Sequence, residues 1–199
     1  MKRIGVFGGT FDPVHYGHIE LARQAVSECM LDEVIVVPVN EQPFKMDRKL
    51  ASNDHRYNML KLAFPDDEKI TVSDIEMAKG NVSYTIDTLR EIKRAYENAE
   101  VSFIVGIDAF LKVEIWKDAE ELLKEFSFII GARPGYKENE QKEFSAYLRE
   151  KFGTKITAVA NTQIPVSSTG IKEFIKAGKS YNEIVPPEVE RYIIANRLY

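Results

Sequence analysis

The chain has 199 residues, with 27 Lys and Arg against 31 Asp and Glu, and its formal net charge at pH 7 is −4. This length suits one hydrophobic core of substantial size, so we expect a single domain over residues 1–199. The acidic balance argues against nucleic acid as a partner, because such binders neutralise phosphates with a basic face. No apolar run approaches the roughly 20 residues that span a bilayer, so no membrane association is expected either.

The cysteine content and the N-terminal stretch predict the compartment. The single cysteine, Cys29, cannot form an internal disulfide, which is typical of proteins in a reducing environment. The first hydrophobic stretch is interrupted after Phe7 by Gly-Gly-Thr and is too short for a signal peptide. We therefore expect a cytoplasmic protein. Cys29 falls on an apolar helical stripe, which favours a buried side chain over a reactive thiol. The sequence leaves the oligomeric state open and is compatible with a homo-oligomer.

Short β-branched runs alternate with amphipathic segments along the chain, a pattern typical of βα units around a parallel sheet. The predicted strands cover residues 2–7, 33–39, 69–74, 101–106, 126–132 and 155–160. The predicted helical segments cover residues 16–30, 55–63, 85–96, 116–124, 138–153, 168–178 and 187–198. The expected fold class is α/β, with a Rossmann-like, doubly wound, mostly parallel sheet and helices on both faces.

Residues 8–18, GGTFDPVHYGH, follow the first predicted strand and open the first predicted helix. Ligands of doubly wound sheets bind at the carboxyl ends of the strands. Gly8 and Gly9 carry no Cβ, so their backbone can approach a bulky anion closely. The N–H groups and the dipole at the start of the next helix favour phosphate. His15 and His18 share one helix face and can donate to the same phosphate chain.

Metal binding and two familiar phosphate motifs are the alternatives for this region. The segment lacks the spacing of a dinucleotide fingerprint and the Lys and Ser/Thr of a Walker A loop. Zinc would require three or four ligands. Beyond His15 and His18 the chain has only His55, with Asp12 or Glu20 as further donors. We therefore expect phosphate contact and no metal site made of protein ligands.

The motif at residues 8–18 resembles the signature of the nucleotidylyltransferase superfamily, in which (G)-x-F-D-x-x-H-x-G-H binds the phosphates of a nucleoside triphosphate. Nearly end to end, the chain also resembles the nicotinate-nucleotide adenylyltransferase family. The further motifs that carry this similarity are Pro43-Phe44-Lys45, His55-Arg56, Ser83-Tyr84-Thr85 with Asp87-Thr88, Gly106-Ile107-Asp108, Trp116, Arg133-Pro134-Gly135 and Val166-Ser167-Ser168-Thr169-Gly170-Ile171-Lys172. The resemblance implies adenylyl transfer from ATP to nicotinate mononucleotide, giving nicotinate adenine dinucleotide and pyrophosphate, in NAD biosynthesis.

The resemblance also implies how ATP is held. It gives catalytic roles to His15 and His18, which bind the ATP phosphates. The other residues that it assigns to ATP are Gly8, Gly9, Thr10, Phe11, Gly106, Ser168, Thr169 and Lys172. The helical part at about residues 166–199 would then complete the ATP site. Mg²⁺ is the implied cofactor, held mainly by the ATP phosphates.

For nicotinate mononucleotide the resemblance implies a second group of residues: Lys45, Tyr84, Thr85, Asp108 and Trp116. Trp116 is the only tryptophan, and its electron-rich face would stack on the pyridinium ring. Lys45 lies in a polar loop that could close over the substrate. Simple packing of Trp116 and capping of a turn by Asp108 are the structural alternatives. The attacking phosphate oxygen is already ionised, so the mechanism needs no general base.

Three positions depart from the family pattern. Lys172 stands where the family usually has arginine, and it lacks the bidentate fork that suits phosphate. Gly170 loosens the first turn of its helix by up to about 1 kcal/mol relative to alanine. Phe44 stands where many relatives have histidine. Arg56 is left outside the predicted site, because a surface ion pair would explain it equally well.

Three other functions remain open from the sequence. The first two are enzymes: an adenylyltransferase acting on phosphopantetheine, and one that prefers nicotinamide mononucleotide. The third is a nucleotide-binding sensor that has kept the site without turnover. Product formation from ATP separates the enzymes from the sensor.

Overall fold

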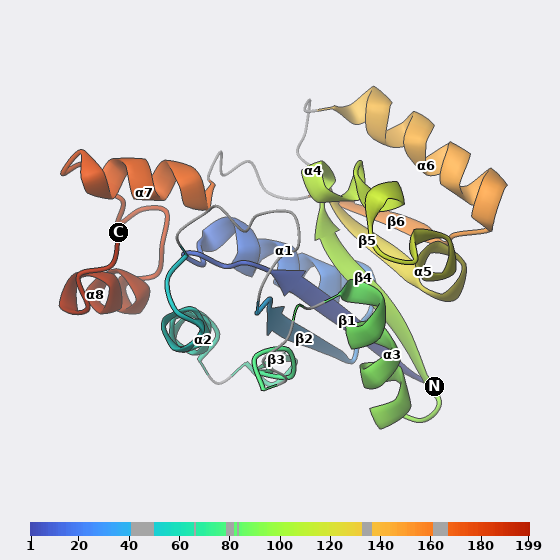
Figure 1. Cartoon of the computed structure of the whole chain (residues 1–199), viewed down its shortest axis with the longest axis horizontal. Coiled ribbons are helices and arrows are strands. Elements are labelled where there is room, and N and C mark those ends of the chain that lie inside the picture. The colour runs from blue at the N-terminus through green and yellow to red at the C-terminus, as the bar shows by residue number, and fades with distance from the viewer. Residues whose placement is uncertain (41–49, 66, 79–81, 83, 133–136, 161–166) are drawn as a thin grey trace.

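Six parallel strands form one sheet in the order β3-β2-β1-β4-β5-β6 (Figure 1). The strands are β1 (Lys2–Gly9), β2 (Glu33–Pro38), β3 (Ile70–Val72), β4 (Ala99–Gly106), β5 (Ser127–Ala132) and β6 (Ile156–Ala160). The structure is a computed structural model and describes residues 1–40, 50–65, 67–78, 82, 84–132, 137–160 and 167–199. This strand order is that of a doubly wound fold, as predicted.

Helices cover both faces of the sheet. They are α1 (Tyr16–Glu28), α2 (Asn53–Ala63), α3 (Thr85–Ala95), α4 (Ile107–Phe110), the 3₁₀ turn η1 (Val113–Ile115), α5 (Ala119–Glu125), α6 (Glu138–Phe152), α7 (Ser168–Lys176) and α8 (Pro187–Ala195). Apolar residues of α1, α2, α7 and α8 join one hydrophobic core. Those of α3, α4, α5 and α6 join the core on the opposite face. The predicted α/β class is therefore confirmed.

The central strands are buried on both faces, which explains their nearly continuous apolar sequences. Along β1, Ile4 and Val6 pack into one core while Phe7 packs into the other. Cys29 is buried beside α1, as its place on the apolar stripe predicted, and burial raises the pKa of its thiol. Among the described residues, none of the helices has both the length and the apolar character needed to cross a bilayer.

The segment after β4 differs from the prediction of helical turns over residues 116–124. The η1 turn ends at Ile115, Trp116 is extended, and α5 begins only at Ala119. Acidic residues 120 and 121 occupy the first turn of α5, where they favour a helix start. The four-residue helix α4 was not predicted, because a segment this short shows no helical periodicity. Trp116 therefore lies in a link between two helices.

The loop that joins β1 to α1 contains Asp12, and the carboxylate of this residue is buried. Its Oδ1 accepts hydrogen bonds from the Ala51 amide at 3.1 Å and the Tyr199 hydroxyl at 2.5 Å, and its Oδ2 pairs with the Lys172 ammonium. Burial and the bond to Asp12 raise the pKa of the Tyr199 phenol far above its usual value, so the phenol remains a donor. Segments far apart in the sequence thus meet at one carboxylate.

The Tyr199→Phe substitution should lower the free energy of unfolding by about 2 kcal/mol, because a buried carboxylate loses a hydrogen bond. Urea denaturation followed by circular dichroism measures this change. The matched control is Tyr147→Phe, which removes a hydroxyl that donates to Glu114 at the surface. Its stability should change by less than about 0.5 kcal/mol. Equal stability of Tyr199→Phe and the wild type would contradict a stabilising role for this contact.

Candidate active site

A cavity of about 650 Å³ opens at the carboxyl ends of β1 and β4. These strands are neighbours, and the strand order reverses between them. The N-terminal parts of α1, α3 and α7 also line the cavity, through residues such as Gly17, Thr85 and Ser168. Backbone N–H groups in the first turn of a helix lack intrahelical partners and attract anions. The cavity is therefore suited to ligands that carry phosphate or carboxylate groups.

The end of β1 and the loop that follows it supply one wall of this cavity, formed by Gly8, Gly9, Thr10 and Phe11. We call residues 8–11 the phosphate turn. A Cβ on Gly9 would approach the Phe11 ring to 2.9 Å, so a larger residue at position 9 would displace this ring. Phe11 is buried and packs edge-on against Phe7 at 5.2 Å between ring centroids. Its ring supports the turn and leaves the glycine backbone at the cavity.

The two histidine rings stack at the start of α1, with centroids 3.7 Å apart and planes inclined by 23°. The backbone N–H of His15 donates to Nδ1 of His18 over 3.3 Å. In a neutral imidazole one nitrogen accepts and the other donates, so this bond places the His18 proton on Nε2. Both residues line the cavity. The pair offers donors of the kind that a phosphate chain requires.

Helix α7 is held against the β1–α1 loop. The Ser167 hydroxyl caps the helix by accepting from the Gly170 amide at 3.1 Å, and the Ser168 hydroxyl donates to the Pro13 carbonyl at 2.9 Å. Ser167 and Ser168 line the cavity. Ser168 was among the residues predicted to bind ATP and Ser167 was not, although a serine before an apolar helix is an ordinary capping signal.

Two predicted ATP residues on α7 lie apart from this wall. Thr169 is exposed, and Lys172 pairs with Asp12. Neither is among the described residues that line the cavity. The Lys172 ammonium also lies 4.8 Å from the centre of the Tyr199 ring. Direct contact of these two side chains with ATP thus stays a prediction.

The opposite wall is formed by Gly106, Asp108 and Trp116 together with Tyr84 and Thr85. The Trp116 ring meets the buried Phe103 ring edge-on at 5.9 Å, so one edge packs while the side chain remains only partly buried. The structure therefore places five of the residues predicted for ATP or the mononucleotide on one wall. Lys45 lies outside the described residues.

Asp108 and Lys117 are charged side chains of this wall. Each lies near a side chain of opposite charge, and Lys117 also lies near an aromatic ring. The Asp108 side chain is 56% exposed and lies 3.9 Å from the Lys137 ammonium. Lys117 pairs with Asp87 at 3.1 Å and lies 4.3 Å from the centre of the Tyr84 ring. The hydrogen bond with Asp87 raises the pKa of the Lys117 ammonium. An ion pair thus lies beside Trp116 at this rim.

Sequence reasoning missed several residues of the cavity. Lys112 and Lys117 flank Trp116, and Glu76 accepts a hydrogen bond of 2.6 Å from Thr88 within the wall. Lysines beside a predicted helix are usually solvated, so no local signal marked these two. Arg56 is 1% exposed, so its interpretation as a surface ion pair is wrong.

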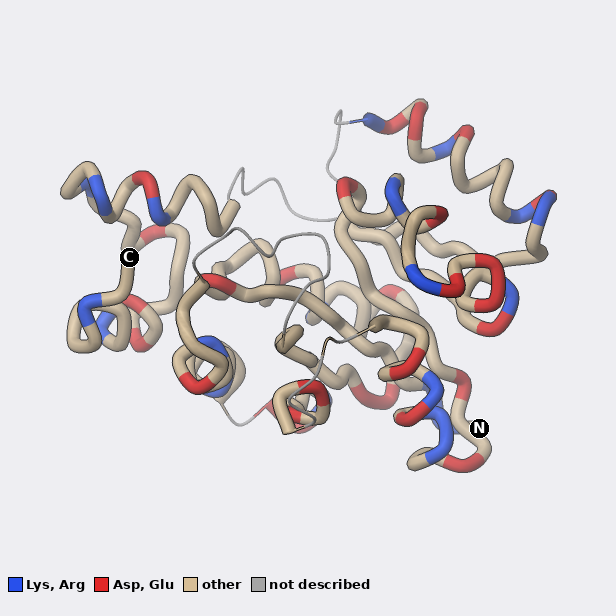
Figure 2. The backbone as a smooth tube through the Cα atoms, in the orientation of Figure 1, with Lys and Arg blue, Asp and Glu red and all other residues tan. Residues whose placement is uncertain are grey.

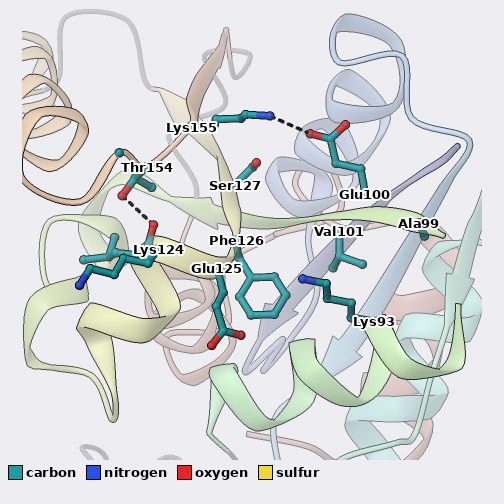
Figure 3. A pocket seen from close by; sticks show the side chains of 12 residues that line it. Lys93, Ala99, Glu100, Val101, Lys124, Glu125, Phe126, Ser127, Thr154 and Lys155 are labelled. Atoms are coloured by element: carbon teal, nitrogen blue, oxygen red, sulfur yellow. Dashed lines mark hydrogen bonds and ion pairs between the residues drawn. The ribbon is translucent and has the colours of Figure 1, made fainter. Parts of the chain in front are cut away.

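A second cavity of about 290 Å³ lies at the amino ends of β4, β5 and β6 (Figure 3). Lys155 and Glu100 face each other across it at 3.7 Å, and the Thr154 hydroxyl donates to the Leu123 carbonyl at 2.8 Å. The Lys155 side chain is 80% exposed. Because ligands of such folds bind at the opposite edge of the sheet, we assign no site to this cavity.

Charged residues of both signs are interspersed along the outer helices α3 and α6 (Figure 2). Some of them form ion pairs, such as Lys142 with Glu138 at 2.6 Å and Arg90 with Glu121 at 2.5 Å. Exposed pairs of this kind contribute little to stability. The groups that distinguish the cavity from these outer helices are therefore its histidines, lysines and helix N-termini.

Comparison with known proteins identifies the family. The family model described as cytidylyltransferase-like matches residues 6–174. A relative from Thermoanaerobacter sp. (strain X514), named "Probable nicotinate-nucleotide adenylyltransferase", is 41% identical over 99% of this chain and 94% of its own length. A relative of the same name from Clostridium acetobutylicum is 32% identical over the full length of both chains.

Solved structures agree with these relatives. The structure of Plasmodium falciparum nicotinic acid mononucleotide adenylyltransferase complexed with NaAD superimposes with a TM-score of 0.83 at 25% identity, over 100% of this chain and 98% of that one. The protein therefore belongs to the cytidylyltransferase-like family and, within it, to the nicotinate-nucleotide adenylyltransferases.

Proposed function

We propose that this enzyme transfers the adenylyl group of ATP to nicotinate mononucleotide, giving nicotinate adenine dinucleotide and pyrophosphate, in NAD biosynthesis. The observation that carries the proposal is one cavity lined by the N-terminal parts of α1, α3 and α7 and by two stacked histidines. Curated relatives over the full chain bear the name of this activity, and the similar Plasmodium structure holds NaAD.

The ATP phosphates would lie between the phosphate turn and the start of α7. Gly8, Gly9 and Thr10 offer backbone close to the cavity, and His18 offers an Nε2–H donor. Ser168 uses its hydroxyl on Pro13, so its expected contribution is through the backbone at the start of α7. Helices α7 and α8 would complete the ATP site within a single domain over residues 1–199.

The mononucleotide would occupy the wall formed by Tyr84, Thr85, Asp108 and Trp116. Trp116 would stack on the pyridinium ring, and the N-terminus of the eleven-residue helix α3 would attract the carboxylate or the phosphate. Lys45, outside the described residues, is expected to approach from the loop after β2.

The reaction is expected to proceed by alignment and electrostatic stabilisation. A phosphate oxygen of the mononucleotide attacks the α-phosphorus of ATP, and the bond to pyrophosphate breaks on the opposite side. The two walls of the cavity would hold these groups in line. The His18 donor and the helix N-termini would stabilise the negative charge that develops on the leaving pyrophosphate.

Mg²⁺ is expected to bind together with ATP. Magnesium prefers oxygen ligands and usually keeps several waters. Asp108 and Glu76 are the carboxylates among the described residues of the cavity wall, and Glu76 already accepts from Thr88. This donor set fits a cation held mainly by phosphate oxygens and water, to which Asp108 would add a protein oxygen. When bound, the metal would neutralise phosphate charge.

We also propose a cytoplasmic location, supported by a single cysteine that is buried and cannot form an internal disulfide. The sequence is compatible with a homo-oligomer.

The proposed function is tested by pyrophosphate release from Mg-ATP with nicotinate mononucleotide, nicotinamide mononucleotide or phosphopantetheine in parallel. We expect kcat/KM for nicotinate mononucleotide to exceed the others by about tenfold or more, because helix N-termini favour the carboxylate. Preference for another acceptor would overturn the substrate assignment. Stabilisation by ATP without product from any acceptor would instead support the nucleotide sensor.

Replacing the donor at the start of α1, His18→Ala, should lower kcat by about 10²–10³ and change either KM by less than about threefold. The reason is that the Nε2–H group would stabilise the negative charge that develops on the phosphates in the transition state. Steady-state kinetics at saturating second substrate measures both values. The control is His55→Ala, whose ring contacts the Tyr192 hydroxyl outside the cavity and whose kcat should be retained. Normal turnover by His18→Ala would refute the phosphate role.

Removing the stacking face, Trp116→Ala, should raise KM for nicotinate mononucleotide by about tenfold or more, since stacking on an aromatic side chain contributes about 1–3 kcal/mol. Trp116→Phe should lose less, because a smaller ring still stacks. KM for ATP is the internal control and should stay within about twofold. If KM rises equally for both substrates, Trp116 acts through packing on Phe103 instead.

A further inference from the structure

The Arg56 guanidinium is buried in α2 and donates hydrogen bonds to four oxygens. Nη1 donates to the Thr10 carbonyl at 2.9 Å, Nε to the Ala51 carbonyl at 3.2 Å, and Nη2 to the Asn40 carbonyl at 3.2 Å and the Asn53 side-chain oxygen at 2.5 Å. Such a fork holds several acceptors in fixed relative positions. One side chain therefore joins segments that are distant in the sequence.

The position of these acceptors links Arg56 to the ATP wall. Thr10 belongs to the phosphate turn, and Asn40 follows β2. The Val39 amide donates to the Gly9 carbonyl at 2.9 Å, so the same two segments are also joined directly. Arg56 thus holds the turn through its carbonyl and is not among the described residues that line the cavity.

The charge of Arg56 is only partly balanced nearby. Its four acceptors are backbone carbonyls and a side-chain amide, all uncharged. Two buried carboxylates act on this charge: Asp12, with which Lys172 pairs, and Glu76, which has the smaller effect. Burial lowers the pKa of Arg56 and the charge of Asp12 opposes this, but arginine remains protonated at neutral pH. Because Lys172 offsets Asp12, the charge of Arg56 is opposed mainly by the weaker effect of Glu76.

We propose that Arg56 is a positioning residue for ATP, which fixes the phosphate turn from behind and adds positive potential at the triphosphate. The inference rests on the proposed function, because ATP is the anion concerned. A charge in the interior is screened less than one at the surface, so it acts on a ligand that it does not touch.

A purely structural role would explain the same hydrogen bonds, and the substitution Asn53→Asp separates the two. Aspartate has the shape of asparagine, keeps the oxygen that accepts from Arg56, and places a negative charge on the guanidinium. It also loses the hydrogen bond that the Asn53 amide donates to the Asn40 side-chain oxygen, and Asn40→Ala loses the same bond without adding a charge. Position 53 is the first residue of α2, where the helix dipole favours a carboxylate. A structural role predicts the same Kd of ATP in both variants, whereas the proposed role predicts weaker ATP binding in Asn53→Asp.

The experiment measures the Kd of Mg-ATP by calorimetry, with Tm and steady-state kinetics on the same preparations. We expect Asn53→Asp to raise the Kd by about five- to twentyfold, more strongly at low salt, whereas Asn40→Ala, which loses the same hydrogen bond, should raise it by less than about twofold. The matched control is Asn58→Asp, the same chemical change at an exposed position of α2. Its Kd should stay within about twofold. Equal Kd values for the two variants would overturn the electrostatic role.

The substitution Arg56→Lys tests positioning, because it keeps the charge and loses the fork. We expect kcat to fall by about tenfold or more at a temperature well below its Tm, with a smaller change in the Kd of ATP. Wild-type kcat in this variant would overturn positioning. If Arg56→Lys does not fold, Asn53→Asp still decides the electrostatic role. Absence of product from the wild type would refute the proposed function, while the Kd values would still test Arg56.

Discussion

The reversal of strand order between β1 and β4 is the constraint on which the site depends. Connections leave these two neighbouring strands toward opposite faces of the sheet, so no helix crosses their shared carboxyl end. The space left there is lined by glycine backbone from β1 and by the N-terminal parts of α1, α3 and α7. An anion-binding cavity thus follows from the topology, and the side chains determine which anions fit.

Most of the fold could be predicted from the sequence, because buried parallel strands have continuous apolar sequences and the longer helices show clear periodicity. The placement of Gly8, Gly9, His15 and His18 at the cavity could also be predicted, since they lie within one local motif after the first strand. The short helix α4 could not, because four residues show no helical periodicity, and neither could the extended Trp116, whose ring packs on Phe103.

Arg56 and Lys172 show which contacts around the site could not be predicted from the sequence. The acceptors of Arg56 include oxygens of residues 10 and 40, and a basic residue in a polar sequence gives no sign of such burial. Lys172 was expected at ATP from the family pattern, yet its ammonium pairs with Asp12. Tertiary contacts determine which group pairs with a buried charge. A sequence motif can therefore identify the charged residue but not its partner.

The convergence on Asp12 has a consequence for how the protein folds. This carboxylate meets donors from positions 51, 172 and 199, so the loop that leads to the histidines is fixed in part by contacts of long sequence separation. Contacts of this kind slow the folding of a domain, because distant segments must meet first. The loop would therefore reach its final conformation once these distant segments have docked on Asp12.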